Sequence, residues 1–183
     1  MSTFSIKIIT LILIFSSFFS CKKDEPSKID FDQLTFDGKG KDFSFKQTYT
    51  LNGETRYVTL SIPEGTVNTK TTIEFYSIYC DTSEFTNHYV NWWRGDVNFF
   101  CCSATTLSKP VTIKLPMPWS SYSASNPYKP YKLKLSKNKN AATEFNNPAN
   151  RELITNYTWD NTNKYIIFET TDLNAAYLIA EPK

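Results

Sequence analysis

The sequence has a single histidine, His88, and its four cysteines include no Cys-x-x-Cys pair. Zinc sites in proteins use clusters of these residues at short spacings, so the sequence predicts no metal site and no cofactor. Dense runs of lysine and arginine are also missing, and the formal net charge is only +2. Because proteins that bind nucleic acid neutralise several phosphates at once, a nucleic-acid partner is not expected.

The sequence also lacks a recognisable catalytic arrangement. Its acidic residues are scattered among turns and strand exteriors, whereas hydrolysis by two carboxylates needs a facing pair across a cleft. Carboxylates lie near His88 in the sequence, at Asp81, Glu84 and Asp96, and could orient a base, but no serine or cysteine stands in a recognisable nucleophile setting. We therefore predict a protein that is not an enzyme, with a hydrolase as the weaker alternative.

Long hydrophobic runs are absent apart from residues 8–19, which follow Lys7, the only charged residue of the first twenty. As a helix this run would span about 18 Å, well short of the roughly 30 Å hydrocarbon core of a bilayer. A positive start, a short apolar middle and small residues near the end are typical of a cleaved secretory signal.

The end of this leader, "SFFSC", resembles the lipobox of bacterial lipoproteins, in which a small residue precedes a cysteine that is diacylated and becomes the new N-terminus. Phe18 stands where that motif usually has leucine. The following "KKDEPSK" is typical of a charged tether between membrane and domain, and two or three acyl chains suffice for stable anchoring. We predict lipidation at Cys21; the alternative is an ordinary cleaved signal that ends near a cysteine.

The length after the leader suits one domain with a sizeable core. The expected organisation is a signal peptide at residues 1–20, a lipidated N-terminus and tether at 21–42 that can include an edge strand, and a β-sandwich domain at 43–183. The expected location is the bacterial cell envelope, with the protein anchored by lipid (palmitate) at the outer membrane. Its partners would be the membrane through this anchor and an envelope protein or polysaccharide.

Helical periodicity is missing throughout the mature chain, and short segments rich in β-branched and aromatic residues alternate with turn residues instead. Asn52-Gly53 is the strongest hairpin signal. This pattern predicts an all-β fold, an antiparallel β-sandwich of about eight or nine strands. A polar stretch at 137–150 is expected to be a flexible excursion. The expected strands are 42–51, 56–63, 71–79, 96–103, 110–116, 131–136, 152–159, 165–171 and 176–181.

Three cysteines remain once Cys21 is assigned to lipid: Cys80, Cys101 and Cys102. In an oxidising compartment a disulfide is favoured, and one thiol is left over. Neighbouring residues of a strand point to opposite faces, so Cys80 can reach Cys101 or Cys102 but not both. We predict a disulfide from Cys80 to Cys101, or to Cys102, that stabilises the domain by about 3 kcal/mol.

"VTLSIPEGTVNTKTTIEF" at 58–75, "LSKPVTIKLPMP" at 107–118 and "YIIFETTDLNAAYLIAE" at 165–181 resemble the ZU-five domain of ankyrins, netrin receptors, zonula occludens proteins and many bacterial surface proteins. The shared pattern is an Ile-Pro-x-Gly step at 62–65, a Lys-Pro-Val strand entry at 109–111 and a last apolar strand. The resemblance implies a β-sandwich used for protein binding and scaffolding. Some relatives cleave themselves at a His-Phe-Ser step, which is Asp-Leu-Asn at 172–174 here, so self-processing is not expected.

Two segments, 81–95 and 116–130, combine large aromatic residues with polar ones and do not alternate, so we expect long loops. Exposed tryptophan and tyrosine bring apolar area with a polar edge, which suits stacking on sugar rings or anchoring a protein partner. The alternative is that these rings fold back and complete the core. We expect the two loops to converge at one end of the sandwich and to supply its binding surface. The candidate binding residues are Tyr89, Trp92, Trp93, Arg94, Trp119 and Tyr122.

Overall fold

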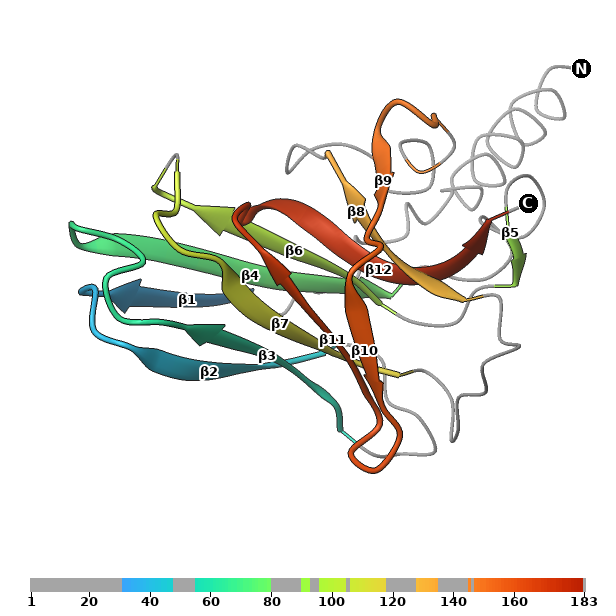
Figure 1. The fold of residues 1–183 in the computed structure, drawn as a ribbon, viewed down its shortest axis with the longest axis horizontal. Helices are drawn as coiled ribbons and strands as arrows, with labels where there is room; N and C mark the ends of the chain where they lie inside the picture. Colours follow the sequence, from blue (N-terminus) through green and yellow to red (C-terminus); the bar gives the residue numbers. More distant parts are fainter. Residues whose placement is uncertain are drawn as a thin grey trace, which may run out of the picture.

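A computed structural model provides the fold. The residues that it describes are 31–47, 55–79, 90–92, 96–104, 106–117, 128–134, 145 and 147–182. Twelve strands lie within this part of the chain, and they form two antiparallel sheets stacked face to face (Figure 1). The predicted all-β antiparallel sandwich is confirmed.

Sheet A, as we name the larger sheet, has the strand order β1-β4-β6-β12-β8-β9, and the short β5 pairs with the end of β12. Every neighbouring pair is antiparallel, and β12, the last strand, runs between β6 and β8. The bounds are β1 Phe31–Phe36, β4 Thr71–Tyr79, β5 Val90–Trp92, β6 Asp96–Cys102, β8 Lys129–Leu133, β9 Arg151–Leu153 and β12 Asn174–Pro182.

Sheet B has the order β10-β11-β7-β3-β2 and is also antiparallel throughout. The chain passes from sheet A to sheet B between β9 and β10, so the predicted strand at 152–159 is in fact two strands in different sheets. The bounds are β2 Lys41–Lys46, β3 Tyr57–Ile62, β7 Val111–Pro116, β10 Tyr157–Asp160 and β11 Tyr165–Thr170.

The strand count exceeds the expected eight or nine for three identifiable reasons. The division of one predicted strand into β9 and β10 adds one, and the three-residue β5 adds another. The third is β1, an edge strand in the stretch assigned to the tether, which pairs with β4 from Phe31 to Phe36. Phe36 is buried in the main core, so the sandwich includes residues before position 43.

Apolar and polar residues alternate along the strands, so the apolar side chains of a strand point into the space between the two sheets. In β3, Val58, Leu60 and Ile62 are buried while the intervening residues are more exposed. Phe45 from sheet B stacks on Phe75 from sheet A with ring centroids 4.6 Å apart, which joins the two sheets at the centre of the core. Aromatic pairs of this kind stabilise the packing beyond the area that they bury.

The outer face of sheet A is also buried, which simple alternation does not predict. Phe145 is fully buried there and contacts Tyr131 edge to face at 5.4 Å, so the expected flexible excursion at 137–150 is wrong at this residue. Its apolar ring is stabilised by leaving water, whatever the polarity of its neighbours in sequence. The buried residues of this face are Tyr76, Val97, Phe99, Tyr131, Leu133, Phe145, Ala176, Leu178 and Ala180.

The sandwich has two different ends. We call "turn end" the end where the sheets are joined by residues 37–40, 63–70, 103–110 and 171–173. We call "loop end" the opposite end, where β2, β4, β7 and β12 finish and β3, β5, β6 and β8 begin (Figure 1). The loop end therefore receives the two segments in which we predicted binding residues.

Candidate functional site

The described flanks of the two aromatic segments lie at the loop end, on the two sides of β12. β5 pairs with β12 at Glu181 and Pro182. On the other side, Lys129 at the start of β8 pairs with Ala180. Trp92 is the last residue of β5. The convergence of the segments themselves stays a prediction, because most of their residues fall outside the described part of the chain.

Several predicted site residues cannot be placed. The lipidation site and one cysteine of the predicted disulfide lie outside the described residues, as do five of the six predicted binding residues. These residues are Cys21, Cys80, Tyr89, Trp93, Arg94, Trp119 and Tyr122.

Cys101 and Cys102 end β6 and are half-buried on opposite faces of sheet A. Cys102 packs against the main core, and Cys101 packs against the cluster on the outer face. Burial raises the pKa of the Cys102 thiol, although a backbone hydrogen bond to Ala104 partly opposes this rise. A neutral thiol is a poor nucleophile. The disulfide to Cys80 stays a prediction. A bridge to Cys101 would lie on the outer face of sheet A, and a bridge to Cys102 would lie on its inner face.

The two sequence motifs of the resemblance meet at the turn end. The Lys109 ammonium donates to the Glu64 carbonyl at 2.6 Å, and the Ser108 hydroxyl donates to the carbonyls of Gly65 and Thr66 at 2.9 and 2.8 Å. Gly65 has a φ of +73°, a conformation that glycine adopts without the steric cost of a side chain. These motifs therefore join two turns, and their role is structural.

The turn between β11 and β12 is built around the buried Tyr177. Its hydroxyl donates to the Asp172 carbonyl at 2.5 Å and lies 2.9 Å from Thr170 Oγ1. Burial raises the pKa of Tyr177, the hydrogen bond with Thr170 lowers it, and the negative charge of Asp172 raises it further. At the positions that match the self-cleavage step, the Asp172 carboxylate accepts from the Asn174 N–H at 2.8 Å, and Leu173 is buried.

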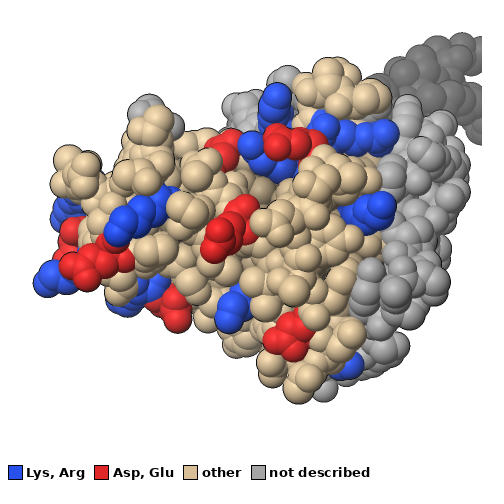
Figure 2. Space-filling model, viewed as in Figure 1, with Lys and Arg blue, Asp and Glu red and all other residues tan. Residues whose placement is uncertain are grey.

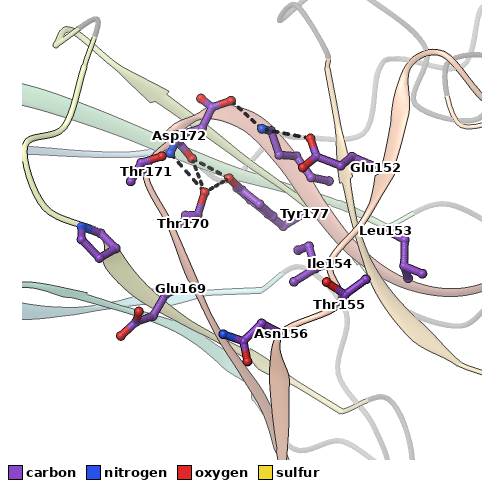
Figure 3. Close-up of a pocket in the computed structure, with 12 residues that line it drawn as sticks. Glu152, Leu153, Ile154, Thr155, Asn156, Glu169, Thr170, Thr171, Asp172 and Tyr177 are labelled. Carbon is purple, nitrogen blue, oxygen red and sulfur yellow. Dashed lines mark hydrogen bonds and ion pairs between the residues drawn. The ribbon is translucent and has the colours of Figure 1, made fainter.

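A pocket of about 440 Å³ opens beside Tyr177, at the edge of the sandwich where the chain crosses from β9 to β10 (Figure 3). We call it the polar pocket, because carboxylates, hydroxyls, an amide and an ammonium group supply most of its lining. Its residues are Pro110, Lys132, Glu152, Leu153, Ile154, Thr155, Asn156, Glu169, Thr170, Thr171, Asp172 and Tyr177.

Among the described residues, Lys132 is the only cationic one that lines the polar pocket. It lies on the inner face of β8, opposite Glu152 on β9 and Tyr177 on β12. Its ammonium is 3.1 Å from Asp172 Oδ2 and 3.4 Å from Glu152 Oε2. Burial lowers the pKa of Lys132, but the hydrogen bond to Asp172 and the charges of Asp172 and Glu152 outweigh this effect, so the pKa is raised. Lys132 is therefore a cation that two carboxylates hold in place.

Glu169 also lines the polar pocket, and it is exposed on β11. Its neighbour Thr170 contacts the Tyr177 hydroxyl, and neighbouring residues of a strand point to opposite faces. The Glu169 side chain therefore points away from Tyr177, as Figure 3 shows. The carboxylates that face Lys132 in the polar pocket are those of Asp172 and Glu152.

The polar pocket has no signal in the sequence. Alternation with Tyr131 and Leu133 predicts that Lys132 points to solvent. The structure differs because Tyr131 and Leu133 pack on the covered outer face of sheet A, which leaves Lys132 on the inner face. The other lining residues come together only because β9 and β10 belong to different sheets, which the sequence does not show.

The described residues contain no group of three or more His, Cys, Asp or Glu side chains that could hold a metal ion. Among them, too, no helix is both long and apolar enough to cross a membrane.

No protein-family model matches the chain, and no curated protein matches it significantly. The resemblance to the ZU-five domain therefore stays a prediction based on the residues quoted above.

Proposed function

We propose that the chain is a lipid-anchored protein of the bacterial cell envelope whose β-sandwich is a structural or protein-binding module and not an enzyme. The leader that ends at Cys21 and the charged tether after it support the anchor. The known roles of the ZU-five domain, which the sequence resembles, support binding and scaffolding.

The difference between the ends of the sandwich is the observation that carries this proposal. The turn end is joined by hydrogen bonds between its own turns, and the loop end receives the two longest aromatic segments. Recognition residues are concentrated on loops that a rigid scaffold positions. A module that is fixed at one end and presents loops at the other suits binding to a partner in the envelope.

Metabolic labelling with palmitate tests the anchor. We expect label in the wild-type protein, and loss of both label and membrane retention in Cys21→Ala. Cys102→Ala is the matched control and should keep both. Membrane retention of Cys21→Ala with no label in the wild type would contradict lipid anchoring.

Glycan capture by a surface lipoprotein is the second candidate function, and the polar pocket favours it. Carboxylates, hydroxyls and amides are the groups that hydrogen-bond to sugar hydroxyls, and Figure 3 shows them around one cavity. A binding screen against polysaccharides, run beside copurification of cross-linked proteins from membranes, separates the two candidates. Saturable polysaccharide binding with no protein partner would replace the first candidate by the second.

A further inference from the structure

A second cavity, of about 210 Å³, opens at the loop end of sheet B. The start of β3, the end of β7 and the β10–β11 turn, at the bottom of Figure 1, line this cavity. We call it the cationic pocket, because its charged residues are Arg56 and Lys164 and no carboxylate of the described residues lines it. An excess of positive charge favours an anionic occupant.

Met117, the residue after β7, holds both cationic residues at the pocket. The Arg56 guanidinium donates a hydrogen bond to the Met117 carbonyl, and the Met117 N–H donates to the Lys164 carbonyl at 2.8 Å. Met117 is fully buried, so this connection is anchored in the interior of the protein. Neither Arg56 nor Lys164 forms an ion pair with a carboxylate of the described residues. The two charges are therefore positioned beside the cavity without a described counter-charge.

Lys164 has a backbone conformation that a lysine rarely adopts. Its φ is +65°, and no other residue of the described part of the chain, apart from glycines, has a positive φ. Glycine adopts this conformation freely, whereas a side chain is disfavoured there. Asp160, in the same turn, does not line the pocket, since its carboxylate accepts from the Asn163 N–H and side-chain amide at 2.9 and 2.8 Å. A strained lysine whose side chain lines a cavity points to a functional role.

Two tyrosines and a proline form a row beside these charges, on the outer face of sheet B. Tyr165 pairs with Pro116, and the register of β3 against β7 places Tyr57 on the other side of Pro116. The residues that follow the two tyrosines and precede the proline are buried in the main core, so the three side chains of the row point outward. Tyr57 is 44 % exposed, and the two tyrosines are two strand spacings apart, roughly 10 Å. All three residues line the cationic pocket.

These observations lead us to one inference, which rests on the second candidate function, glycan capture, because it names the class of glycan and its site. We propose that the cationic pocket and its tyrosines bind an acidic polysaccharide, a chain whose sugar units carry carboxylates. The rings of Tyr57 and Tyr165 stack on the apolar faces of sugar units. The Arg56 guanidinium and the Lys164 ammonium bind a carboxylate of the same chain through charge-assisted hydrogen bonds.

Selectivity for such a chain requires both the rings and the charges. Figure 2 shows lysine, arginine and acidic side chains interspersed over the described part of the face in view, without a large area of one sign. This face as a whole therefore does not attract a polyanion. Cations alone would bind any polyanion, whereas the row of tyrosines selects a polyanion that is built from sugar rings.

Three soluble polymers test the inference on the mature protein, with Kd measured by isothermal titration calorimetry. Polygalacturonate has sugar rings and carboxylates, dextran has sugar rings alone, and polyglutamate has carboxylates alone. We expect polygalacturonate to bind about tenfold more tightly than either of the others, because only polygalacturonate can use both the rings and the charges. Equal binding of dextran, equal binding of polyglutamate, or no binding of polygalacturonate would overturn the inference.

Lys164→Gly tests the charge without a loss of folding. It removes the ammonium group and also suits the left-handed backbone, so we expect about a tenfold rise in Kd for polygalacturonate together with a higher unfolding midpoint. Weaker binding by a more stable variant cannot be a result of unfolding. Lys70→Gln is the control, since it removes an exposed lysine at the turn end and should leave Kd unchanged. Equal effects of the two variants, or an unchanged Kd in Lys164→Gly, would overturn the site.

Tyr57 variants test the stacking separately. Tyr57→Ala should raise Kd for polygalacturonate about tenfold, whereas Tyr57→Phe keeps the ring and should leave Kd nearly unchanged. An unchanged Kd in Tyr57→Ala would overturn the stacking.

The polysaccharide screen distinguishes failure of this site from failure of glycan capture. Polysaccharide binding that neither Lys164→Gly nor Tyr57→Ala weakens would keep glycan capture and overturn the site. Absence of binding to every polysaccharide in the screen would overturn both.

Discussion

The turn end and the loop end of the sandwich differ in both chemistry and connection. The four connections that join the two sheets at the turn end contain no phenylalanine, tyrosine or tryptophan and include three of the five glycines of the chain. They also bond to one another: the Gly65 N–H donates to the Gly38 carbonyl at 2.9 Å, and the Ser108 N–H donates to the Thr66 carbonyl at 3.0 Å. At the loop end, the segments 81–95 and 116–130 are longer and rich in aromatic residues, whereas the β10–β11 turn at the same end, residues 161–164, is short and contains none.

The difference shows how one pair of sheets can be stabilised at one end and still present variable connections for recognition at the other. Short turns with specific backbone conformations fix the register of the strands, and any change there acts on stability. Long connections can vary without disturbing the ladders, so they can be used for recognition. The polar pocket belongs to neither end, because it lies at the open edge where one strand crosses between the sheets.

The largest expected effect comes from replacing the tryptophans at the loop end. In Trp92→Ala/Trp93→Ala we expect partner binding to weaken by at least about 2 kcal/mol, with the free energy of unfolding nearly unchanged, if the rings are exposed anchors. Trp159→Ala is the comparison, since Trp159 is half-buried against the core and its loss should cost about 3 kcal/mol of stability.

Urea unfolding beside a partner-binding assay measures both quantities for these tryptophan variants. A loss of 3 to 5 kcal/mol of stability in the Trp92/Trp93 variant is the cost of removing core rings. That result would contradict the assignment of recognition to the loop end, because Trp92 and Trp93 would then belong to the core.

The turn end should respond next most strongly, through Gly38. Its φ is +91°, and a Cβ added there would lie 2.8 Å from the Val67 carbonyl oxygen. Gly38→Ala should therefore lower the free energy of unfolding by about 2 kcal/mol, since both the conformation and the contact are unfavourable.

Gly40→Ala serves as the control for Gly38→Ala. Its added Cβ would approach no closer than 3.1 Å, to the Glu64 nitrogen, and the cost should be less than half. Similar losses in the two variants would mean that the left-handed conformation of Gly38 is not what the turn end requires.

Much of the fold could be predicted because alternation reports burial on one side of a strand. It identified β3, β4, β6, β7 and β11 close to their observed bounds. It could not identify the two-sided burial of β12, where Tyr177 and Leu178 are both fully buried on opposite faces. A sequence window does not contain the distant residue, such as Phe145, that covers a second face.

The candidate site was less predictable than the fold. The aromatic segments stand out because large apolar rings among polar residues break the alternation. The polar pocket has no such signature, since Lys132, Glu152 and Asp172 are separated in the sequence and resemble ordinary surface charges. Their meeting depends on the pairing of β8 with both β9 and β12, which is a property of the assembled sheet.

Alkaline pH should weaken the fold. Burial raises the pKa of Tyr76 to about 12 and also raises the pKa of Tyr177. The pKa of Lys132 is raised by Asp172 and Glu152, which outweigh the opposite effect of burial. A group whose pKa is higher in the folded state contributes stability below its unfolded value, and that contribution falls as the pH rises toward the folded value. Burial also raises the pKa of Cys102. With unfolded values near 8.5 for cysteine, 10 for tyrosine and 10.4 for lysine, stability should begin to fall above about pH 8.5 and fall more steeply above pH 10. Urea unfolding across this range measures the decline, and a flat profile to pH 11 would contradict it.

The smallest effects should come from removing single hydroxyls of buried tyrosines, which compares the two regions most finely. Near the turn end, Tyr177→Phe removes the donor to the Asp172 carbonyl and should cost about 1 kcal/mol. Toward the loop end, the buried Tyr76 hydroxyl has no hydrogen-bond partner among the described residues, so Tyr76→Phe should be neutral or slightly stabilising. Both variants keep the ring, so packing is held constant and unfolding midpoints compare the hydroxyls alone. A loss in Tyr76→Phe as large as that in Tyr177→Phe would show that hydrogen bonding stabilises both regions equally, and the contrast between them would then rest on their connections alone.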